Sequence, residues 1–281
     1  MRSRLHLCVP AFAVTLLAGS VLAGNPLVSD QTDTVGLGTP HASLETTFGT
    51  EFMTGGGAAG DFDNDGDLDL FIIGGSASTD HLYINDGTGH FTDEAAAWGV
   101  DRAHQGSGAA VGDFNNDGWL DLMVTSLGTP TQARTDWSVL YKNNGDGTFT
   151  DVTATAGVGE GNNTFLADAF SPVFGDYDLD GDLDLAVAGW YGGSALYRNN
   201  GDGTFTDVTL TALDIDITGV SGVRGFAPRF VDMDGDRYPE ILFVADFETS
   251  KYFRNNGDGT FTNLTPGNGT GLDSNGMGNT F

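Results

Sequence analysis

Cysteine is nearly absent from this sequence of 281 residues, in which Cys8 is the only one. A disulfide framework of the kind that holds many small secreted domains together is therefore excluded. Basic residues are also scarce, with 11 Lys and Arg against 39 Asp and Glu and a formal net charge of −28. Because affinity for nucleic acids comes mainly from Lys and Arg that neutralise phosphates, this balance excludes most phosphate-backbone binding. A chain with this excess of acidic residues is instead expected to bind cations.

The N-terminus carries an apolar run of the kind found in secretory signals. Residues 1–6 include Arg2 and Arg4, residues 7–22 are almost wholly apolar, and Ala23 ends a small-residue cleavage pattern. We expect residues 1–23 to be a signal peptide and residues 24–49 to be an N-terminal lead-in segment. A retained membrane anchor is the alternative, but the run is shorter than the roughly 20 residues of a spanning helix. The predicted localisation is secreted, extracellular or periplasmic, with no membrane span after cleavage.

A hairpin-like segment occurs four times in the rest of the chain. The copies are LYINDGTGHFTD at 82–93, LYKNNGDGTFTD at 140–151, LYRNNGDGTFTD at 196–207 and YFRNNGDGTFTN at 252–263. Their equivalent glycines, Gly87, Gly145, Gly201 and Gly257, are 58, 56 and 56 residues apart. An Asp-rich segment precedes each copy, as in GDFDNDGDLDLFIIGG from residue 60 and GDYDLDGDLDLAVAGW from residue 175. The chain therefore contains four copies of one repeat.

Each repeat predicts four strands. They are a small-residue strand, an apolar strand after the acidic loop, a third strand ending near an Asn pair, and a fourth through Phe and Thr. The glycine-containing turns between alternating segments are typical of hairpins. We therefore predict an all-β fold in which residues 50–281 form a β-propeller of four-stranded antiparallel blades. The alternatives are a β-helix or solenoid, whose repeats are usually shorter, and a tandem array of small sandwiches.

The Asp-rich segments place oxygen-bearing side chains at alternate positions. Counting the first Asp as position 1, positions 1, 3, 5, 7 and 9 are Asp61, Asp63, Asp65, Asp67 and Asp69 in loop one, Asp113, Asn115, Asp117, Trp119 and Asp121 in loop two, Asp176, Asp178, Asp180, Asp182 and Asp184 in loop three, and Asp232, Asp234, Asp236, Tyr238 and Glu240 in loop four. Calcium takes several oxygen ligands in a tightly turned loop. Because position 7 varies, we expect its backbone carbonyl to be the ligand. The pattern predicts about four Ca²⁺ sites, one per repeat.

Two other interpretations of these loops are weaker. An EF-hand needs a bidentate Glu at position 12, which here is Ile72, Val124, Val187 or Phe243. A solvated turn would leave three carboxylates about 5 Å apart, whose repulsion totals about 10 kcal/mol at an effective dielectric of 20. That repulsion is comparable with the whole stability of a domain. The loops are therefore predicted to need a cation.

Other polar residues carry weaker signals. The acids of the Gly-Asp-Gly turns are expected to be turn residues rather than ligands; they are Asp146, Asp202 and Asp258. Four histidines share no metal-ligand spacing and are expected to be surface or strand residues; they are His41, His81, His90 and His104. No nucleophile elbow, P-loop, H-E-x-x-H or C-x-x-C motif occurs. The sequence therefore shows no catalytic constellation.

The loops DFDNDGDLDL, DFNNDGWLDL and DYDLDGDLDL, together with the LYRNNGDGTFTDVT type of segment, resemble the FG-GAP (VCBS) repeat proteins. Relatives of that family include the integrin α head and the cartilage acidic protein family. The resemblance covers roughly residues 50–281 and implies a seven-bladed, calcium-binding propeller that is usually extracellular and engaged in adhesion or ligand binding. Loop four departs from the pattern with Arg237 in place of a glycine and with Glu240 in place of Asp. Its site is expected to be the weakest.

Four repeats are fewer than seven blades. Residues 271–281 resemble the strand before each acidic loop, so we expect a fragment of a longer propeller, with a closed four-bladed propeller as the alternative. The predicted function is a secreted calcium-binding module for adhesion or for binding a protein or glycan ligand, not an enzyme. The alternative function is a secreted polysaccharide lyase or hydrolase.

Strand order predicts two faces for such a blade. The acidic loops are first connections and the Gly-Asp-Gly turns are third connections, so both should lie on one face. The longest departures from the repeat should lie on the opposite face, at 128–137 with Arg134 and Trp137, and at 154–169. Because binding residues concentrate on loops, the opposite face is the predicted place for a partner.

Overall fold

The protein is described here from a computed structural model that covers residues 29–39, 55–75, 77–127, 138–158, 169–190, 194–214, 217 and 223–268. The predicted signal peptide, Arg134, Trp137 and residues 271–281 lie outside these ranges. The chain divides into two compact units, Met1–Gly38 and Thr39–Phe281. In the first unit, a turn at 32–36 is closed by the hydrogen bond that Val35 N donates to Gln31 O at 3.0 Å.

The described part of the second unit is built from four-stranded antiparallel sheets, each with its strands in chain order. Sheet one contains β1 (Gly57–Gly60), β2 (Asp69–Ile72), β3 (His81–Asn85) and β4 (Phe91–Asp93); sheet two contains β5 (Gly106–Gly112), β6 (Asp121–Ser126), β7 (Val139–Asn143) and β8 (Phe149–Asp151); sheet three contains β9 (Ala169–Gly175), β10 (Asp184–Gly189), β11 (Ala195–Asn199) and β12 (Phe205–Asp207); sheet four contains β13 (Gly225–Val231), β14 (Glu240–Ala245), β15 (Lys251–Asn255) and β16 (Phe261–Asn263). The predicted four-stranded repeats are confirmed.

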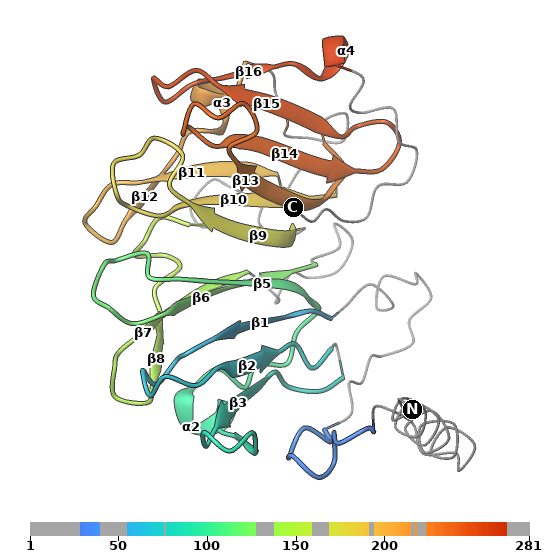
Figure 1. The fold of residues 1–281 in the computed structure, drawn as a ribbon, viewed down its shortest axis with the longest axis vertical. Coiled ribbons are helices and arrows are strands. Elements are labelled where there is room, and N and C mark those ends of the chain that lie inside the picture. The colour runs from blue at the N-terminus through green and yellow to red at the C-terminus, as the bar shows by residue number, and fades with distance from the viewer. Residues whose placement is uncertain are drawn as a thin grey trace, which may run out of the picture. The chain divides into compact units, whose positions relative to one another are not determined.

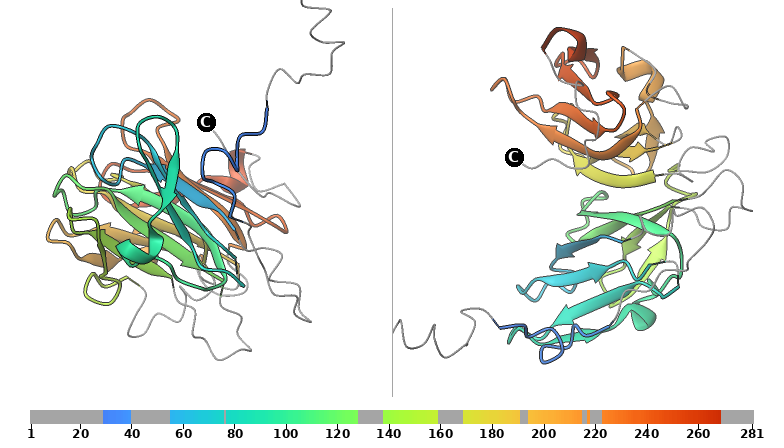
Figure 2. Two further views of the ribbon diagram at one scale, coloured as in Figure 1. Left: turned by 90° about the horizontal axis from the view of Figure 1, so that it is seen from below. Right: turned by 90° about the vertical axis from the view of Figure 1, so that its right-hand side faces the viewer.

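The sheets follow one another as blades, with their first strands side by side. β1 contacts β5, β5 contacts β9, and β9 contacts β13 (Figures 1 and 2). Glycine at the end of these strands lets residues of the next blade approach closely. A Cβ atom at Gly175 would lie 2.6 Å from the Phe230 ring, and one at Gly112 would lie 2.9 Å from the Leu183 side chain. The small-residue character of the first strand thus reflects its inner position in the propeller.

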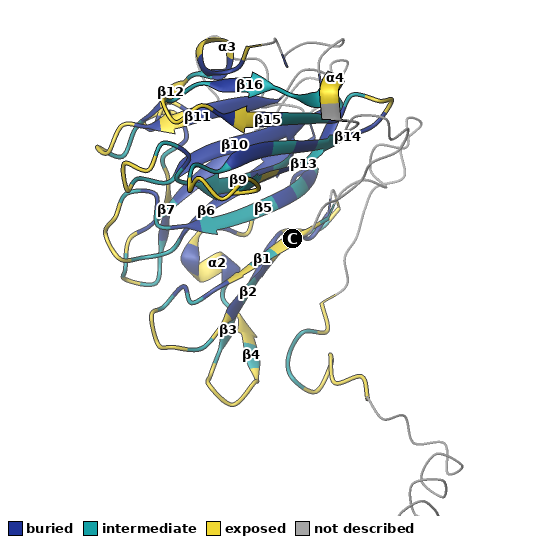
Figure 3. Ribbon diagram, turned by 45° about the horizontal axis from the view of Figure 1, so that its top comes forward, coloured by how far each residue is buried: buried dark blue, intermediate teal, exposed yellow. Residues whose placement is uncertain are grey.

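Each pair of neighbouring blades shares one hydrophobic core. Phe71 and Leu82 of blade one pack with Leu122 of blade two, Met123 packs with Leu185 of blade three, and Ile241 of blade four packs in one cluster with Leu196. Buried residues therefore run through the middle of the sheets, with exposed residues at the connecting loops (Figure 3).

Short helical turns, which the sequence did not indicate, follow three of the fourth strands. They are α2 (Ala95–Trp98), α3 (Thr209–Ala212) and α4 (Thr265–Asn268). Among the residues that the structure describes, no helix is long and apolar enough to cross a membrane.

Candidate metal centre

The acidic loops connect the first and second strands of each blade, and they lie beside the Gly-Asp-Gly turns of the same blade. A side chain at Gly87 would meet Asp67 Oδ2 at 2.7 Å, and one at Gly145 would meet the Trp119 ring at 2.6 Å. Both kinds of connection therefore share one face, as their place in the strand order predicts. The position 7 side chains lie over the turn glycines.

The aspartate at position 1 shapes each loop by accepting backbone amides from later in the loop. In loop one, Asp61 Oδ1 accepts the Asp65 amide at 3.0 Å and Asp61 Oδ2 accepts the Gly66 amide at 2.9 Å. Loops two and three repeat both bonds. The tight coil needs left-handed backbone at positions 4 and 6, where Asn64 has a φ of 58° and Gly66 a φ of 98°.

The acid at position 9 is wholly buried and is anchored to its own loop and to the third strand of the blade. Asp184 accepts the Tyr177 amide at 3.0 Å through Oδ2 and the Asn199 amide at 2.9 Å through Oδ1. Asp69 and Asp121 accept the equivalent pairs of amides. The carboxylate thus joins its own loop to the third strand of the blade.

Three of the four loops bring carboxylate oxygens of positions 1, 3 and 9 within 4.8 Å of one another. These groups are Asp61, Asp63 and Asp69; Asp176, Asp178 and Asp184; and Asp232, Asp234 and Glu240. The side chain at position 5 is not in any of these groups. It accepts a hydrogen bond from the amide at position 7, as when the Asp67 amide donates to Asp65 Oδ1 at 2.9 Å. The structure therefore gathers positions 1, 3 and 9, and in loop one the position 5 side chain, Asp65, also lies close enough to interact directly with Asp63.

Two buried oxygens in these groups have no hydrogen-bond partner: Asp178 Oδ1 and Glu240 Oε1. A buried carboxylate oxygen without a donor is costly unless a cation or proton satisfies it. Three hard oxygen donors around one point are also the ligand type that calcium prefers. The residues present therefore fit a calcium ion.

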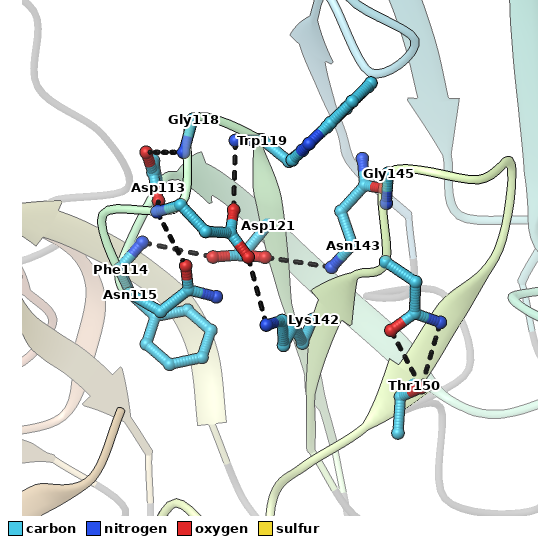
Figure 4. A network of polar contacts seen from close by, with 12 residues as sticks. Asp113, Phe114, Asn115, Gly118, Trp119, Asp121, Lys142, Asn143, Gly145 and Thr150 are labelled. Carbon is cyan, nitrogen blue, oxygen red and sulfur yellow. Dashed lines mark hydrogen bonds and ion pairs between the residues drawn. The ribbon is translucent and has the colours of Figure 1, made fainter. Parts of the chain in front are cut away.

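Loop two differs because it carries Asn115 at position 3 and a built-in cation. Lys142 Nζ lies 3.0 Å from Asp117 Oδ2, while Asn115 Oδ1 accepts the Asp117 amide at 2.9 Å (Figure 4). Figure 4 also shows Asp121 beneath the loop, between Phe114 and Asn143. This loop has fewer acids than loops one and three, and one of its acids already pairs with an ammonium group.

Loop four exchanges the two special backbone positions. Gly235 stands at position 4 and Arg237 at position 6, and both have a φ of 83°. Arg237, which stands where the other loops have glycine, therefore adopts a conformation that glycine enters more readily. Met233 at position 2 is 52% exposed, whereas its counterparts Phe62 and Tyr177 are buried in the cores between blades.

Replacing Arg237 by Gly is expected to stabilise the chain by about 0.5–1 kcal/mol, because the left-handed conformation no longer places a Cβ against the backbone. The gain corresponds to a rise in Tm of about 1–4 °C, measured by calorimetry in saturating calcium. Arg254→Gly, a matched loss of one arginine from the interior of β15, should lower the Tm instead. An equal fall in both variants would show that Arg237 is not strained.

Burial perturbs several loop acids. It raises the pKa of Asp121 and of Asp184 to about 7, against the lowering effect of the two amides that each accepts. Burial also raises the pKa of Asp69, Asp178 and Glu240, and the neighbouring acids of each loop add to the effect. The metal-free folded state therefore binds protons more tightly than the unfolded chain does, whose Asp pKa is about 3.9.

Without calcium, the Tm is expected to fall as the pH rises from about 4 to about 7, because folding then requires these buried carboxylates to ionise. With calcium the direction should reverse, since protons compete with the metal for the same oxygens. Melts in excess chelator and in excess calcium at pH 5 and pH 8 test both signs. Asp184→Asn should flatten the curve in chelator, and a metal-free Tm that rises with pH would contradict the prediction.

The acids of the Gly-Asp-Gly turns lie in exposed turns, as expected. Asp202 Oδ1 accepts the Thr204 hydroxyl at 2.5 Å and the Thr204 amide at 3.1 Å. Asp146 and Asp258 make the corresponding hydroxyl contacts. Each of these side chains is therefore used within its own turn.

The prediction for His104 was wrong, because this residue is neither in a strand nor at the surface. Its Nε2 lies 2.8 Å from Asp80 Oδ2 and its Nδ1 lies 3.1 Å from Ser126 Oγ, and all three residues are buried. Ser126 Oγ also donates to Gln105 O at 3.3 Å. Because Ser126 is fully buried, a substrate could not reach it. The contacts of His104 instead connect blades one and two. His81 lies in β3, His90 lies at the surface, and His41 is outside the described residues.

A polar cavity of about 320 Å³ lies between blades three and four on the face of the acidic loops. It is lined by Tyr177, Asp178 and Asp180 of loop three, by Arg198, and by the turn residues Asp258 and Gly259. Sequence reasoning did not identify it, because its walls come from two separate repeats.

Comparison with known proteins places these features in context. The profile of the FG-GAP-like repeat matches residues 43–124, 131–187 and 176–243. Human cartilage acidic protein 1 is 27% identical over 197 residues, which is 66% of this chain and 27% of that protein. Rat integrin alpha-7 is 28% identical over 156 residues, which is 53% of this chain and 13% of that protein. The chain thus spans about a quarter or less of the length of these relatives.

One similar solved structure belongs to an Agrocybe aegerita lectin that is described as recognising non-reducing terminal N-acetylglucosamine. It has a TM-score of 0.44 and 19% sequence identity, and the match covers 75% of this chain and 52% of that one.

Proposed function

The chain belongs to the FG-GAP-like repeat family, and on that premise we propose that it is a secreted, calcium-binding β-propeller module that binds a protein or glycan ligand. Calcium is proposed to act on structure: it neutralises the acids of each loop and so fixes the first two strands of the blade. The signal sequence predicted at residues 1–23 is the basis for secretion. Binding rather than catalysis is proposed because the sequence carries no nucleophile elbow, P-loop, H-E-x-x-H or C-x-x-C motif.

The observation that carries the calcium proposal is the grouping of positions 1, 3 and 9 in loops one, three and four. Each group joins a loop tip to a wholly buried carboxylate at the start of the second strand. Bound calcium would therefore link the loop to the sheet, and it would take the place of the covalent cross-links that the cysteine-poor chain lacks. The side chains at positions 1, 3 and 9 would hold the ion.

Calcium titration of the metal-depleted chain by calorimetry tests the proposal. We expect three to four sites, and we expect Asp178→Ala to remove one of them. Asp202→Ala is the matched control, since it removes an exposed acid of the same blade that is used in its own turn. No heat of calcium binding, or equal losses in both variants, would contradict the assignment of the loops.

The sites are expected to be unequal. Loops one and three have five acids and a glycine at position 6, so Asp63→Ala or Asp178→Ala should lower the Tm in calcium more than Asp234→Ala does. The melts should be compared at one calcium concentration, because bound ligand stabilises by mass action. A larger loss of Tm for Asp234→Ala would reverse this ranking. It would indicate that the Glu240 oxygen without a hydrogen-bond partner matters more for calcium binding than the number of acids in the loop.

Secretion is tested separately by expression with the native N-terminus. The expected product in the medium or periplasm begins at Gly24, as read by mass spectrometry of the intact protein. A product that keeps residues 1–23 would show a retained anchor.

A further inference from the structure

Four aromatic side chains gather at the end of blades three and four that is opposite the acidic loops. Trp190 lies 5.1 Å from Phe226 and 5.8 Å from Phe247, measured between ring centroids, and Phe170 lies 4.8 Å from Phe226. The guanidinium of Arg224 lies 5.1 Å above the Phe247 ring. We call these five residues the aromatic platform. They come from four separate stretches of chain, at the start of β9, after β10, around the start of β13 and after β14, which explains why the sequence did not reveal the cluster.

Phe247 is held out of the core by an unfavourable turn. The turn connects β14 to β15, on the right in Figure 1, and is closed by the bond from the Thr249 amide to Asp246 O at 3.1 Å. Its central residues, Phe247 and Glu248, have φ values of 56° and 60°. Two successive left-handed residues define a type I′ turn, for which Asn-Gly is preferred. A bulky Phe is strained in this conformation, yet the ring remains 58% exposed.

The turn is also fixed in place. The Asp246 amide donates to Arg224 O at 3.1 Å, and the Arg224 amide donates to Thr249 Oγ1 at 3.0 Å. These bonds join the tip of one hairpin to Arg224, which immediately precedes β13 and carries the guanidinium. Phe247 is therefore presented in one orientation beside Arg224 before any ligand arrives, which reduces the entropy lost on binding.

The size of the platform favours a small ligand over a protein surface. An aromatic side chain has roughly 150–250 Å² of surface, so Phe247 leaves about 100 Å² open, Trp190 and Phe226 are partly covered, and Phe170 is only 8% exposed. A stable protein interface needs about 800 Å² from each partner. The open apolar area instead matches one or two sugar rings.

The charges around the platform favour a neutral ligand. A cationic ligand over Phe247 would be repelled by the Arg224 guanidinium that lies above the ring. An anionic ligand would be repelled by the exposed Glu248 and by the net charge of −28 on the chain. A neutral pyranose avoids both costs. Its axial C–H groups form an apolar face that packs on aromatic rings, and its hydroxyls can pair with Arg224 as donor and Glu248 as acceptor.

We propose that the aromatic platform of Phe247, Trp190, Phe226, Phe170 and Arg224 is a binding site for a neutral sugar residue of an oligosaccharide, stacked on Phe247. The proposal rests on the proposed function as a binding module and names its ligand class and the surface that holds it. It places the ligand away from the acidic loops, so calcium would support the site only through the stability of the blades.

The test is an array of neutral oligosaccharides, with terminal hexoses and N-acetylhexosamines, probed with the calcium-loaded full chain and followed by calorimetric titration of the best ligand. Phe247→Gly removes the ring and suits the left-handed turn, so its Tm should stay near that of the wild type while its affinity falls about ten-fold or more. Phe247→Trp should keep binding within about three-fold, because the stacking face remains. Leu210→Ala, which removes a 68% exposed apolar side chain elsewhere, should change nothing.

The outcomes separate this proposal from the proposed function. If no neutral oligosaccharide binds while calcium still binds and stabilises the chain, the sugar site is overturned and the calcium module stands. If a sugar binds equally well to Phe247→Gly but not to Arg198→Ala, the ligand lies in the polar cavity and the platform is wrong. If Phe247→Gly instead loses binding to a basic protein and the array is negative, the occupant is a protein, and the sugar class is wrong.

Discussion

Removing calcium from the chain is expected to lower its Tm by about 15–30 °C. Three loops each hold three acids with oxygens within 4.8 Å of one another. A ligand present at 100 times its Kd adds about 2.7 kcal/mol per site, so three such sites contribute about 8 kcal/mol. For a domain of this size each kcal/mol shifts the Tm by about 2–4 °C. The measurement is a pair of calorimetric melts at pH 8, one in millimolar calcium and one in excess chelator.

Magnesium is the matched control for this experiment. It has the same charge as calcium but demands a tight octahedral shell and gives up its water reluctantly. At equal concentration it should recover only a small part of the shift. Equal melts with calcium and with chelator would contradict the proposed role of calcium, and equal shifts with both ions would show charge screening rather than defined sites.

The second largest effect is expected from Asn199→Ala, at about 3–4 kcal/mol of lost stability, or roughly 6–16 °C in Tm. Asn199 is buried at the end of β11, and its Nδ2 donates to Phe114 O of the previous blade at 2.7 Å and to Leu183 O at 3.0 Å. Its Oδ1 accepts the Gly201 amide at 3.0 Å. Alanine would leave two buried carbonyls and one amide without these partners.

Asn85→Ala is the matched control, because Asn85 has the same place in blade one. Its Nδ2 donates to Leu68 O at 3.1 Å within its own blade, and the residue is more exposed than Asn199. We expect this variant to lose no more than about 1 kcal/mol. A similar loss in both variants would show that the bond between blades adds little to stability.

Much of the blade could be predicted from the sequence, because each signal is local. Strand alternation, the glycine turns and the acidic loop lie within one repeat, so four copies give the four-stranded sheets and the shared face of loops and turns. The left-handed Arg237 could also be predicted, since the glycines at position 6 of the other loops mark the conformation required there.

The rest depends on contacts between segments that are distant in sequence. Asn143, Asn199 and Asn255 each donate to the position 2 carbonyl of the previous blade, at 2.8, 2.7 and 2.8 Å. The repeated Asn pair was visible, but nothing in one repeat shows that its first member reaches a neighbour. The same limit applies to the buried contacts of His104 and to the aromatic platform, whose members meet only through packing of blades three and four.

The cores lie between blades rather than within them, and this decides what the smallest folding unit is. Leu185, Val187 and Tyr197 complete a core begun by Met123 and Leu140, so a single repeat cut from the chain would expose one whole face of its sheet to water. Isolated repeats should therefore be unfolded, and pairs should be the first to show structure. Stability should then grow with each added repeat. This is the behaviour of a linear array in which the interface between neighbouring repeats contributes more free energy than the repeats do by themselves.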